Sequence, residues 1–260
     1  MNKAKIIEDA VALADAAREL SLRYFRANDL TVENKRPEDF DPVTQADREI
    51  ELRIRELLAD RAPDDGILGE EFENQETRSG LTWVIDPIDG TRAFMAGQPT
   101  WGTLISVYDG EKPIFGLIDQ PYIGERFMGG WGQAILSRAG QNHPIQTRKD
   151  RKLKAAILYS TFPEVGKPEE RAAFERVASH VQLTRYGMDC YAYGMMAAGF
   201  IDLVIEAGLQ SYDIYAPIAL IEAAGGQVTN WQGEPFGASR QAVALADPAR
   251  ADEVFSLLND

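Results

Sequence analysis

The chain has 260 residues with a formal net charge of −14, and this acidic balance excludes nucleic-acid binding through a basic face. Its single cysteine, Cys190, excludes an internal disulfide, and its 2 histidines exclude a metal centre built mainly from histidine. Because no apolar run approaches the ~20 residues that span a bilayer, we expect a cytoplasmic protein with no membrane partner.

Two amphipathic helices are predicted at the start of the chain. Apolar side chains recur at helical spacing over residues 3–26 and again over residues 44–60. Thr44 and Asp47 stand three residues apart at the start of the second helix, as in a capping box with aspartate in place of glutamate. The segments "GILGEEF" and "LTWVID" then predict two short strands, each ending in acids.

From Trp101 to Arg138 the pattern changes to strands. Four apolar segments, "GTLISVY", "KPIFGLID", "ERFMGG" and "QAILSR", are separated by short turn sequences such as Asp109-Gly110. Turns of this length join neighbouring antiparallel strands. The region therefore predicts an antiparallel meander.

The second half of the chain alternates between predicted strands and helices. Helices are expected over residues 168–180, 190–199, 214–224 and 248–258, and strands over 155–160, 181–186, 201–206, 226–230 and 242–246. The charged, polar stretch 139–154 lies between the two patterns, so we expect the halves 1–145 and 146–260. Strands followed by alternation predict a layered mixed α/β (α+β) architecture.

Acids cluster at the ends of predicted elements, and the richest segment is "WVIDPIDGTRAF". Asp86 follows an apolar run, and Pro87 is expected to stop the strand because it has no N–H. The Ile88 carbonyl is then available to the same ion as the carboxylates. Gly90 and Thr91 follow as a helix N-terminus would, where free N–H groups hold a phosphate. The acids concerned are Asp47, Glu70, Glu71, Asp86, Asp89 and Asp213. Oxygen ligands in this number favour a hard cation such as Mg²⁺.

Simpler interpretations exist for single acids. Asp89 alone would be a helix cap, and Asp213 would be the N-cap of the helix at 214–224, with Pro217 tolerated in its first turn. Asp47 and Thr44 are better explained as a cap than as ligands, with a role behind the metal site. The ordered set of acid, proline, acid, glycine and hydroxyl favours the metal interpretation for Asp86 and Asp89.

Three motifs, "GEE", "WVIDPIDGT" and "YDIYAPIALIEAAGG", resemble those of the inositol monophosphatase superfamily, and the resemblance covers about residues 5–257. It implies an αβαβα layered fold and a lithium-sensitive phosphomonoesterase that uses two or three Mg²⁺ ions. It also implies a small-molecule phosphomonoester substrate and a homodimer.

The resemblance also implies roles for individual residues. The implied metal ligands are Glu70, Asp86, Asp89, Asp213 and the Ile88 carbonyl. The implied phosphate-binding residues are Gly90, Thr91 and Arg92. Glu70 and Thr91 would orient the attacking water as catalytic residues, together with Asp86. The resemblance also places Lys35 in a flap loop near the metals.

The flanking segments "DGTRAFMAGQPTWGTLI" and "RYGMDCYAYGMMAAGFIDLVIEAGLQSYD" are most similar to the histidinol-phosphate phosphatases of the superfamily. Asp189 stands where inositol-specific members usually carry a small residue. Asp189 and Glu206, with Arg185 nearby, are therefore expected to bind the substrate, and the two acids would bind the ammonium of histidinol phosphate. The alternative is that Asp189 caps the helix at 190–199.

Other functions remain open at this point. A phosphatase with an aspartyl-phosphate intermediate carries Asp-x-Asp-Gly-Thr, whereas this chain has one residue more between the acids. A non-catalytic metal- or phosphate-binding module is an alternative of another class. Within the enzyme interpretation, inositol 1-phosphate or another sugar or nucleotide phosphate is the alternative substrate.

Overall fold

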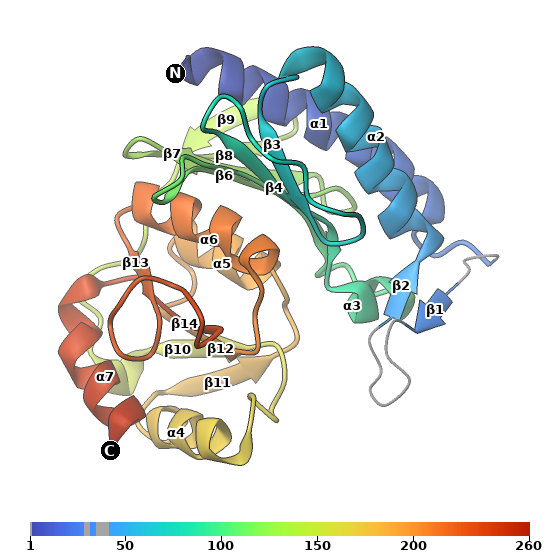
Figure 1. Cartoon of the computed structure of the whole chain (residues 1–260). Coiled ribbons are helices and arrows are strands. Elements are labelled where there is room, and N and C mark those ends of the chain that lie inside the picture. Colours follow the sequence, from blue (N-terminus) through green and yellow to red (C-terminus); the bar gives the residue numbers. More distant parts are fainter. Residues whose placement is uncertain (1, 29–31, 35–41) are drawn as a thin grey trace.

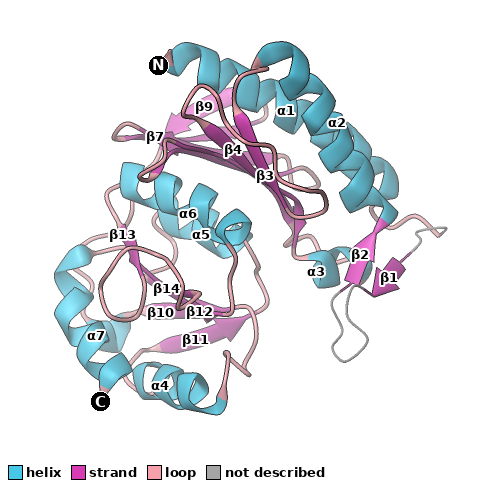
Figure 2. Ribbon diagram, in the orientation of Figure 1, coloured by secondary structure: helices cyan, strands magenta, loops and turns pink. Residues whose placement is uncertain are grey.

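The computed structural model describes residues 2–28, 32–34 and 42–260. Its elements form five layers, helix–sheet–helix–sheet–helix, which confirms the predicted architecture (Figures 1 and 2). Among the described residues no helix combines the length and apolar character needed to cross a membrane.

The outer layer consists of α1 (Lys3–Tyr24) and α2 (Gln45–Arg61), which cover one face of the larger sheet (Figure 1). The predicted capping box is present at α2, where Thr44 and Asp47 bond each other's backbone. Apolar residues of both helices, such as Leu13 and Ile50, are fully buried against the sheet. A short hairpin of β1 (Val32–Asn34) and β2 (Pro42–Thr44), which the sequence did not predict, precedes α2.

The larger sheet has seven strands in chain order, of which β3 and β4 are parallel and the others antiparallel. It confirms the predicted meander. Its strands are β3 (Gly66–Gly69), β4 (Thr82–Asp89), β5 (Gly102–Tyr108), β6 (Pro113–Gln120), β7 (Glu125–Gly130), β8 (Gln133–Arg138) and β9 (Gln141–Pro144). Strand β9 lies inside the polar stretch 139–154, which therefore is not only a connection, and a 3₁₀ turn, η1 (Leu153–Ala155), follows it.

The middle layer is formed by α5 (Tyr191–Ala197) and α6 (Ser211–Ala223), which lie between the two sheets (Figure 2). Helix α6 packs closely on the larger sheet because glycines face it. A Cβ atom on Gly116 would lie 2.2 Å from the carbonyl oxygen of Ala216, and one on Gly129 would lie 2.5 Å from Cα of Leu220. Any larger residue at these positions would push α6, and the acid it carries, away from the sheet.

The second sheet has five strands in the order β11-β10-β12-β14-β13. Helices α4 (Pro168–Ala178) and α7 (Ala251–Asn259) cover its outer face (Figure 1). A 3₁₀ turn, η2 (Pro248–Arg250), precedes α7. The strands are β10 (Ile157–Ser160), β11 (Leu183–Tyr186), β12 (Leu203–Ala207), β13 (Gln227–Thr229) and β14 (Gln241–Leu245). The first sheet thus ends at Pro144 and the second begins at Ile157, while the division into halves at 145/146 stays a prediction.

Candidate functional site

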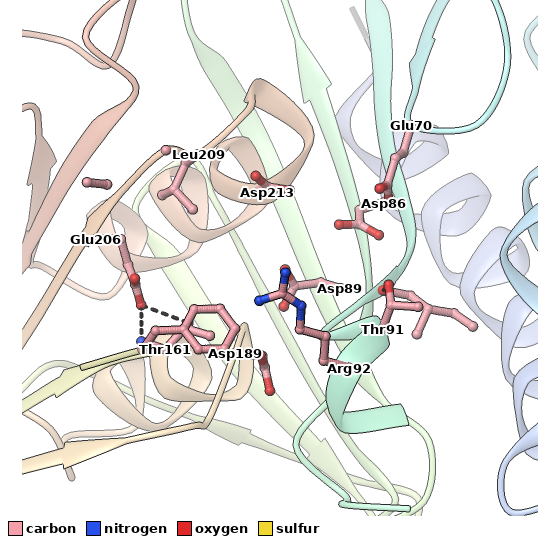
Figure 3. Close-up of a pocket in the computed structure, with 15 residues that line it drawn as sticks. Glu70, Asp86, Asp89, Thr91, Arg92, Thr161, Asp189, Glu206, Leu209 and Asp213 are labelled. Carbon is pink, nitrogen blue, oxygen red and sulfur yellow. Dashed lines mark hydrogen bonds between the residues drawn. The ribbon is translucent and has the colours of Figure 1, made fainter. Parts of the chain in front are cut away.

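A cavity of about 290 Å³ lies between elements of the two sheets and the middle layer. Acids dominate its lining, and they come from distant parts of the chain (Figure 3). The residues that line it are Glu70, Asp86, Ile88, Asp89, Gly90, Thr91, Arg92, Thr161, Phe162, Asp189, Glu206, Ala207, Gly208, Leu209 and Asp213. The cavity therefore contains the predicted metal-binding and phosphate-binding residues, and also Asp189 and Glu206.

Strand register places Glu70 next to Asp86. Strands β3 and β4 are parallel, with Gly69 opposite Ile85. The next residue of each strand therefore carries an acid at the same edge of the sheet. Behind this edge, the buried Glu51 of α2 accepts a hydrogen bond from the backbone N–H of Glu71 at 2.8 Å. This contact could not be predicted from the sequence, because Glu51 occupies an ordinary helical position.

Strand β4 does not stop at Pro87 as predicted but continues to Asp89 with an irregularity. Its pairing with β5 jumps from Asp86 opposite Leu104 to Asp89 opposite Gly102. The prediction was correct that the ladder is interrupted there, and the carbonyl of Pro87 instead accepts a bond from the Thr103 hydroxyl at 2.8 Å. The irregularity lets both aspartates line the same cavity, although they stand three positions apart with two residues between them.

The Ile88 carbonyl also differs from the expectation that it is free. It accepts a hydrogen bond from the Thr91 hydroxyl at 3.2 Å. A carbonyl oxygen has a second lone pair, so this bond leaves one acceptor site for an ion. Helix α3 (Thr91–Met95) starts as predicted after Gly90, whose φ of +84° suits glycine.

Asp213 is not the N-cap of its helix, which corrects the simpler interpretation. Helix α6 begins earlier, with Gln210 at the N-cap position, so Asp213 is the third helical residue and accepts a bond from the Gln210 N–H at 2.7 Å. Pro217 consequently lies inside the helix and not in its first turn. It cannot donate to the carbonyl four residues back, that of Asp213.

Carboxylate oxygens of Asp86, Asp89 and Asp213 lie within 4.8 Å of one another. Burial, and then the charge of Glu70, raise the pKa of Asp86 well above its ordinary value, and burial with the charge of Asp189 does the same for Asp89. The Oδ1 atom of Asp86 is buried without a hydrogen-bond partner among the described residues. An all-oxygen donor set with an unsatisfied buried carboxylate fits Mg²⁺.

Cys190 packs beneath this cluster. It is buried, and its backbone N–H donates to Asp89 Oδ2 at 2.6 Å. Burial raises the pKa of its thiol well above the usual value, and the charge of Asp89 adds to the effect. Cys190 therefore positions Asp89 and is unsuited to act as a nucleophile.

Asp189 has a strained backbone, with φ at +47°. Its carboxylate accepts a bond from the Thr100 hydroxyl at 3.1 Å, and the cap position of α5 shows no side-chain hydrogen bond. It does not cap the helix. A Cβ on Gly90 would lie 2.8 Å from Asp189 Cγ, so glycine is needed opposite it. Burial raises the pKa of Asp189 to about 6, against the opposing effects of the Thr100 bond and the Arg92 charge.

Glu206, on β12, is buried and well supplied with donors. Its Oε1 accepts from the Thr161 N–H at 2.7 Å and the Thr161 hydroxyl at 2.9 Å (Figure 3). Its Oε2 accepts from the Ser160 hydroxyl at 3.2 Å. Burial raises the pKa of Glu206 to about 7 despite these bonds, and the charge of Asp189 adds to it. Thr161 and Thr100 were not predicted from the sequence, because they contact Glu206 and Asp189, which are far from them along the chain.

Some predicted residues are not in the cavity. Arg185 lies on β11, the edge strand of its sheet, where it is exposed and does not line the cavity. Asp47 is buried in its capping box with Thr44, and burial raises its pKa to about 7. Its charge reaches Asp86, which agrees with a role behind the site. Lys35 lies outside the described residues.

The sequence and fold of the chain are similar to those of known proteins. The model of the inositol monophosphatase family matches residues 2–258. Bifunctional phosphatase IMPL2 of Arabidopsis thaliana is 42% identical over 90% of this chain and 67% of its own length. A histidinol-phosphatase of Mycobacterium tuberculosis is 33% identical over 96% of both chains. The structure of an inositol monophosphatase from Zymomonas mobilis is 35% identical over 100% of both chains, with a TM-score of 0.87.

These similarities bear on the alternatives left open by the sequence. They support a phosphoric monoester hydrolase over a non-catalytic module, and the family that matches is the inositol monophosphatase family and not one with an aspartyl-phosphate intermediate. Names of both histidinol-phosphatases and inositol monophosphatases occur among the similar proteins, so similarity alone leaves the alcohol of the ester open.

Proposed function

Because this chain belongs to the inositol monophosphatase family and is a phosphoric monoester hydrolase, we propose that it hydrolyses L-histidinol phosphate to L-histidinol and phosphate, in the biosynthesis of histidine. The observation that carries the proposal is the pair Asp189 and Glu206. Both line the cavity but lie outside the Asp86–Asp89–Asp213 cluster. Two acids that line the cavity outside this cluster, the buried Glu206 and the partly buried Asp189, are suited to a cationic part of the substrate.

The ammonium of histidinol phosphate is the cation that this pair would bind. Inositol phosphate has hydroxyl groups in its place, and burying two carboxylates against a neutral polyol offers no charge compensation. The relatives named histidinol-phosphatase support this substrate. Inositol 1-phosphate is the second candidate, supported by the similar structure from Zymomonas mobilis.

Proteins of this family generally depend on Mg²⁺, and the carboxylate cluster supports two or three ions held by these residues: Glu70, Asp86, Asp89, Asp213 and the Ile88 carbonyl. When bound, Mg²⁺ would supply Lewis-acid activation of water and of the phosphoryl group. Glu70 and the Thr91 hydroxyl would orient the water that attacks phosphorus in line with the leaving alcohol. The N–H groups of Gly90 and Thr91, with Arg92, would hold the phosphate.

The test is phosphate release, with and without Mg²⁺, from L-histidinol phosphate, inositol 1-phosphate, adenosine 3′,5′-bisphosphate and fructose 1,6-bisphosphate. We expect the highest kcat/KM for histidinol phosphate. In Asp189→Asn, which keeps the side-chain shape, KM for this ester should rise about tenfold with a smaller change in kcat, because one charge-assisted bond is lost.

The control is Asp150→Asn. Asp150 is also an aspartate with positive φ, at +61°, but it is exposed and outside the cavity. Its variant should behave as the unaltered protein. A preference for inositol 1-phosphate, or an equal effect of Asp189→Asn on all four esters, would contradict the histidinol phosphate assignment. We also propose that the protein is a homodimer in the cytoplasm. Sedimentation of the purified protein tests the dimer.

A further inference from the structure

Phe162 is a large apolar side chain that lines the acidic cavity and is 43% exposed. Its place is fixed by its neighbour in sequence, since the N–H and hydroxyl of Thr161 both donate to Glu206, at 2.7 and 2.9 Å. Figure 3 shows Thr161 and Glu206 on one side of the cavity, with Glu70 and Asp86 on the other. Phe162 therefore belongs to the side where the alcohol part of the substrate would bind.

The aromatic ring of Phe162 already contacts a flat cation. The guanidinium carbon of Arg92, from α3, lies over the ring at 5.0 Å from its centroid. Guanidinium groups bind aromatic faces through charge and through stacking. The contact shows that a planar cationic group reaching in from the cavity fits against this ring.

We propose that Phe162 is a specificity-determining residue that binds a planar aromatic ring of the substrate's alcohol, on the ring face that Arg92 now covers. This inference rests on the proposed function. Histidinol phosphate has three parts. Metal ions held by the acid cluster, with Thr91, would bind the phosphate, and Asp189 with Glu206 would bind the ammonium. The imidazole then needs a partner, and Phe162 is the aromatic residue that lines the described cavity.

The chemistry of the ring fits this place. Imidazole is planar and becomes a cation when protonated, so it stacks on Phe162 as the guanidinium does, and nearby acids favour the protonated form. Leu209 adds apolar lining. Inositol is a non-planar polyol and gains little from an aromatic face. Phe162 would thus favour one ester without contacting the reacting atoms.

The experiment compares L-histidinol phosphate with O-phosphoethanolamine, which keeps the phosphate and ammonium and lacks only the imidazolylmethyl group. In Phe162→Ala, the ratio of kcat/KM for the two esters should fall about tenfold, mainly through KM. Phe162→Leu should lose most of the same ratio, because it restores bulk without an aromatic face, and Phe162→Trp should retain it. Phe200→Ala is the control, since Phe200 is 63% exposed and outside the cavity.

The outcomes separate this inference from the substrate assignment. If histidinol phosphate is the preferred ester but Phe162→Ala lowers kcat/KM equally for both esters, the ring site is wrong and the function stands. If another ester is preferred, that ester serves as substrate and L-histidinol and ethanolamine serve as inhibitors. Stronger inhibition by L-histidinol that Phe162→Ala removes supports the ring site, and equal inhibition by the two amines overturns it.

Discussion

The two sides of the cavity carry acids of different character. On one side, Asp86 is buried with an oxygen that lacks a hydrogen-bond partner among the described residues, close to Asp89 and Asp213. On the other side, Glu206 accepts bonds from the Thr161 N–H and hydroxyl and the Ser160 hydroxyl. The first group needs a cation to offset desolvation and repulsion, whereas the second has much of its need met by protein donors.

This difference separates reaction from selection. The crowded acids of the first group have their charge offset when ions bind, so they form a site for metal and phosphate that suits any phosphomonoester. Acids held by hydroxyl and amide donors keep a fixed position without an ion, and they can discriminate between alcohols. Substitutions on the metal side should therefore lower the activity toward every ester, whereas substitutions on the alcohol side should change the preference between esters.

The largest effect is expected from Asp213→Asn on the metal side. Asparagine can still accept the bond from the Gln210 N–H, so the helix start should persist. We expect activity toward every ester to fall by more than about 100-fold, the upper figure for loss of a mere supporting partner of a metal ligand. Normal turnover, with calorimetry showing unchanged Mg²⁺ binding, would remove Asp213 from the metal site.

A smaller loss is expected from Gly69→Ala, which acts on the metal side from behind. The new Cβ would lie 1.9 Å from Oε1 of Glu51. The other oxygen of this carboxylate, Oε2, accepts the hydrogen bond from the Glu71 N–H. Either the Glu51 carboxylate leaves the Glu71 N–H or the segment that carries Glu70 shifts, and both loosen the support behind Glu70. We expect activity to fall about 10- to 100-fold and to recover partly at high Mg²⁺.

Gly237→Ala is the matched control for this substitution. The nearest atom to its Cβ would be 3.9 Å away, and Gly237 has no left-handed backbone. Equal kinetics for the Gly69 and Gly237 variants, with equal Mg²⁺ dependence, would show that the contact behind Glu70 has no role in the site.

The alcohol side should respond to pH. Burial raises the pKa of Glu206 to about 7 and that of Asp189 to about 6. Both carboxyls are neutral below these values and ionised above them, so attraction for an ammonium grows as pH rises from 5.5 to 8. The ratio of kcat/KM for O-phosphoethanolamine over glycerol 1-phosphate should rise by about tenfold, as for one charge-assisted bond. The ammonium lowers the second phosphate pKa of O-phosphoethanolamine, so kcat/KM of each ester is first divided by its fraction of phosphate dianion. A flat corrected ratio would contradict ammonium binding by this pair.

Local pattern was enough to predict most of the fold and the metal side of the site. The acids of the metal side stand in one short motif and at element ends, and periodicity located the long helices and the meander. Strand β9 was missed because its residues are all exposed, so no alternation marks it, and it forms after a tight turn at Ala139-Gly140. The start of α6 was misplaced because glutamine is not a favoured N-cap residue.

The supporting contacts of the site were beyond sequence reasoning for a different reason. Thr100 meets Asp189 across 89 positions of the chain, and Thr161 meets Glu206 across 45. Glu51, on α2, accepts a hydrogen bond from Glu71, which is 20 positions further along the chain. None of these pairs shares an element, so only the packing of the layers brings them together. Arg185 was misassigned because its neighbourhood in sequence is close to Asp189 while its strand lies at a sheet edge.

The smallest expected effect is that of Thr100→Val. The hydroxyl of Thr100 donates to Asp189 Oδ2, and valine keeps the shape without the donor. The carboxylate loses one neutral hydrogen bond, and KM for histidinol phosphate should rise about threefold with little change in kcat. Because a donor to the charged form is lost, the pKa of Asp189 should rise, moving the alkaline gain in kcat/KM to higher pH. Thr100→Ser should restore both. A loss of kcat shared by all esters, with no shift of the pH profile, would mean that Thr100 supports the fold of the loop and not the position of Asp189.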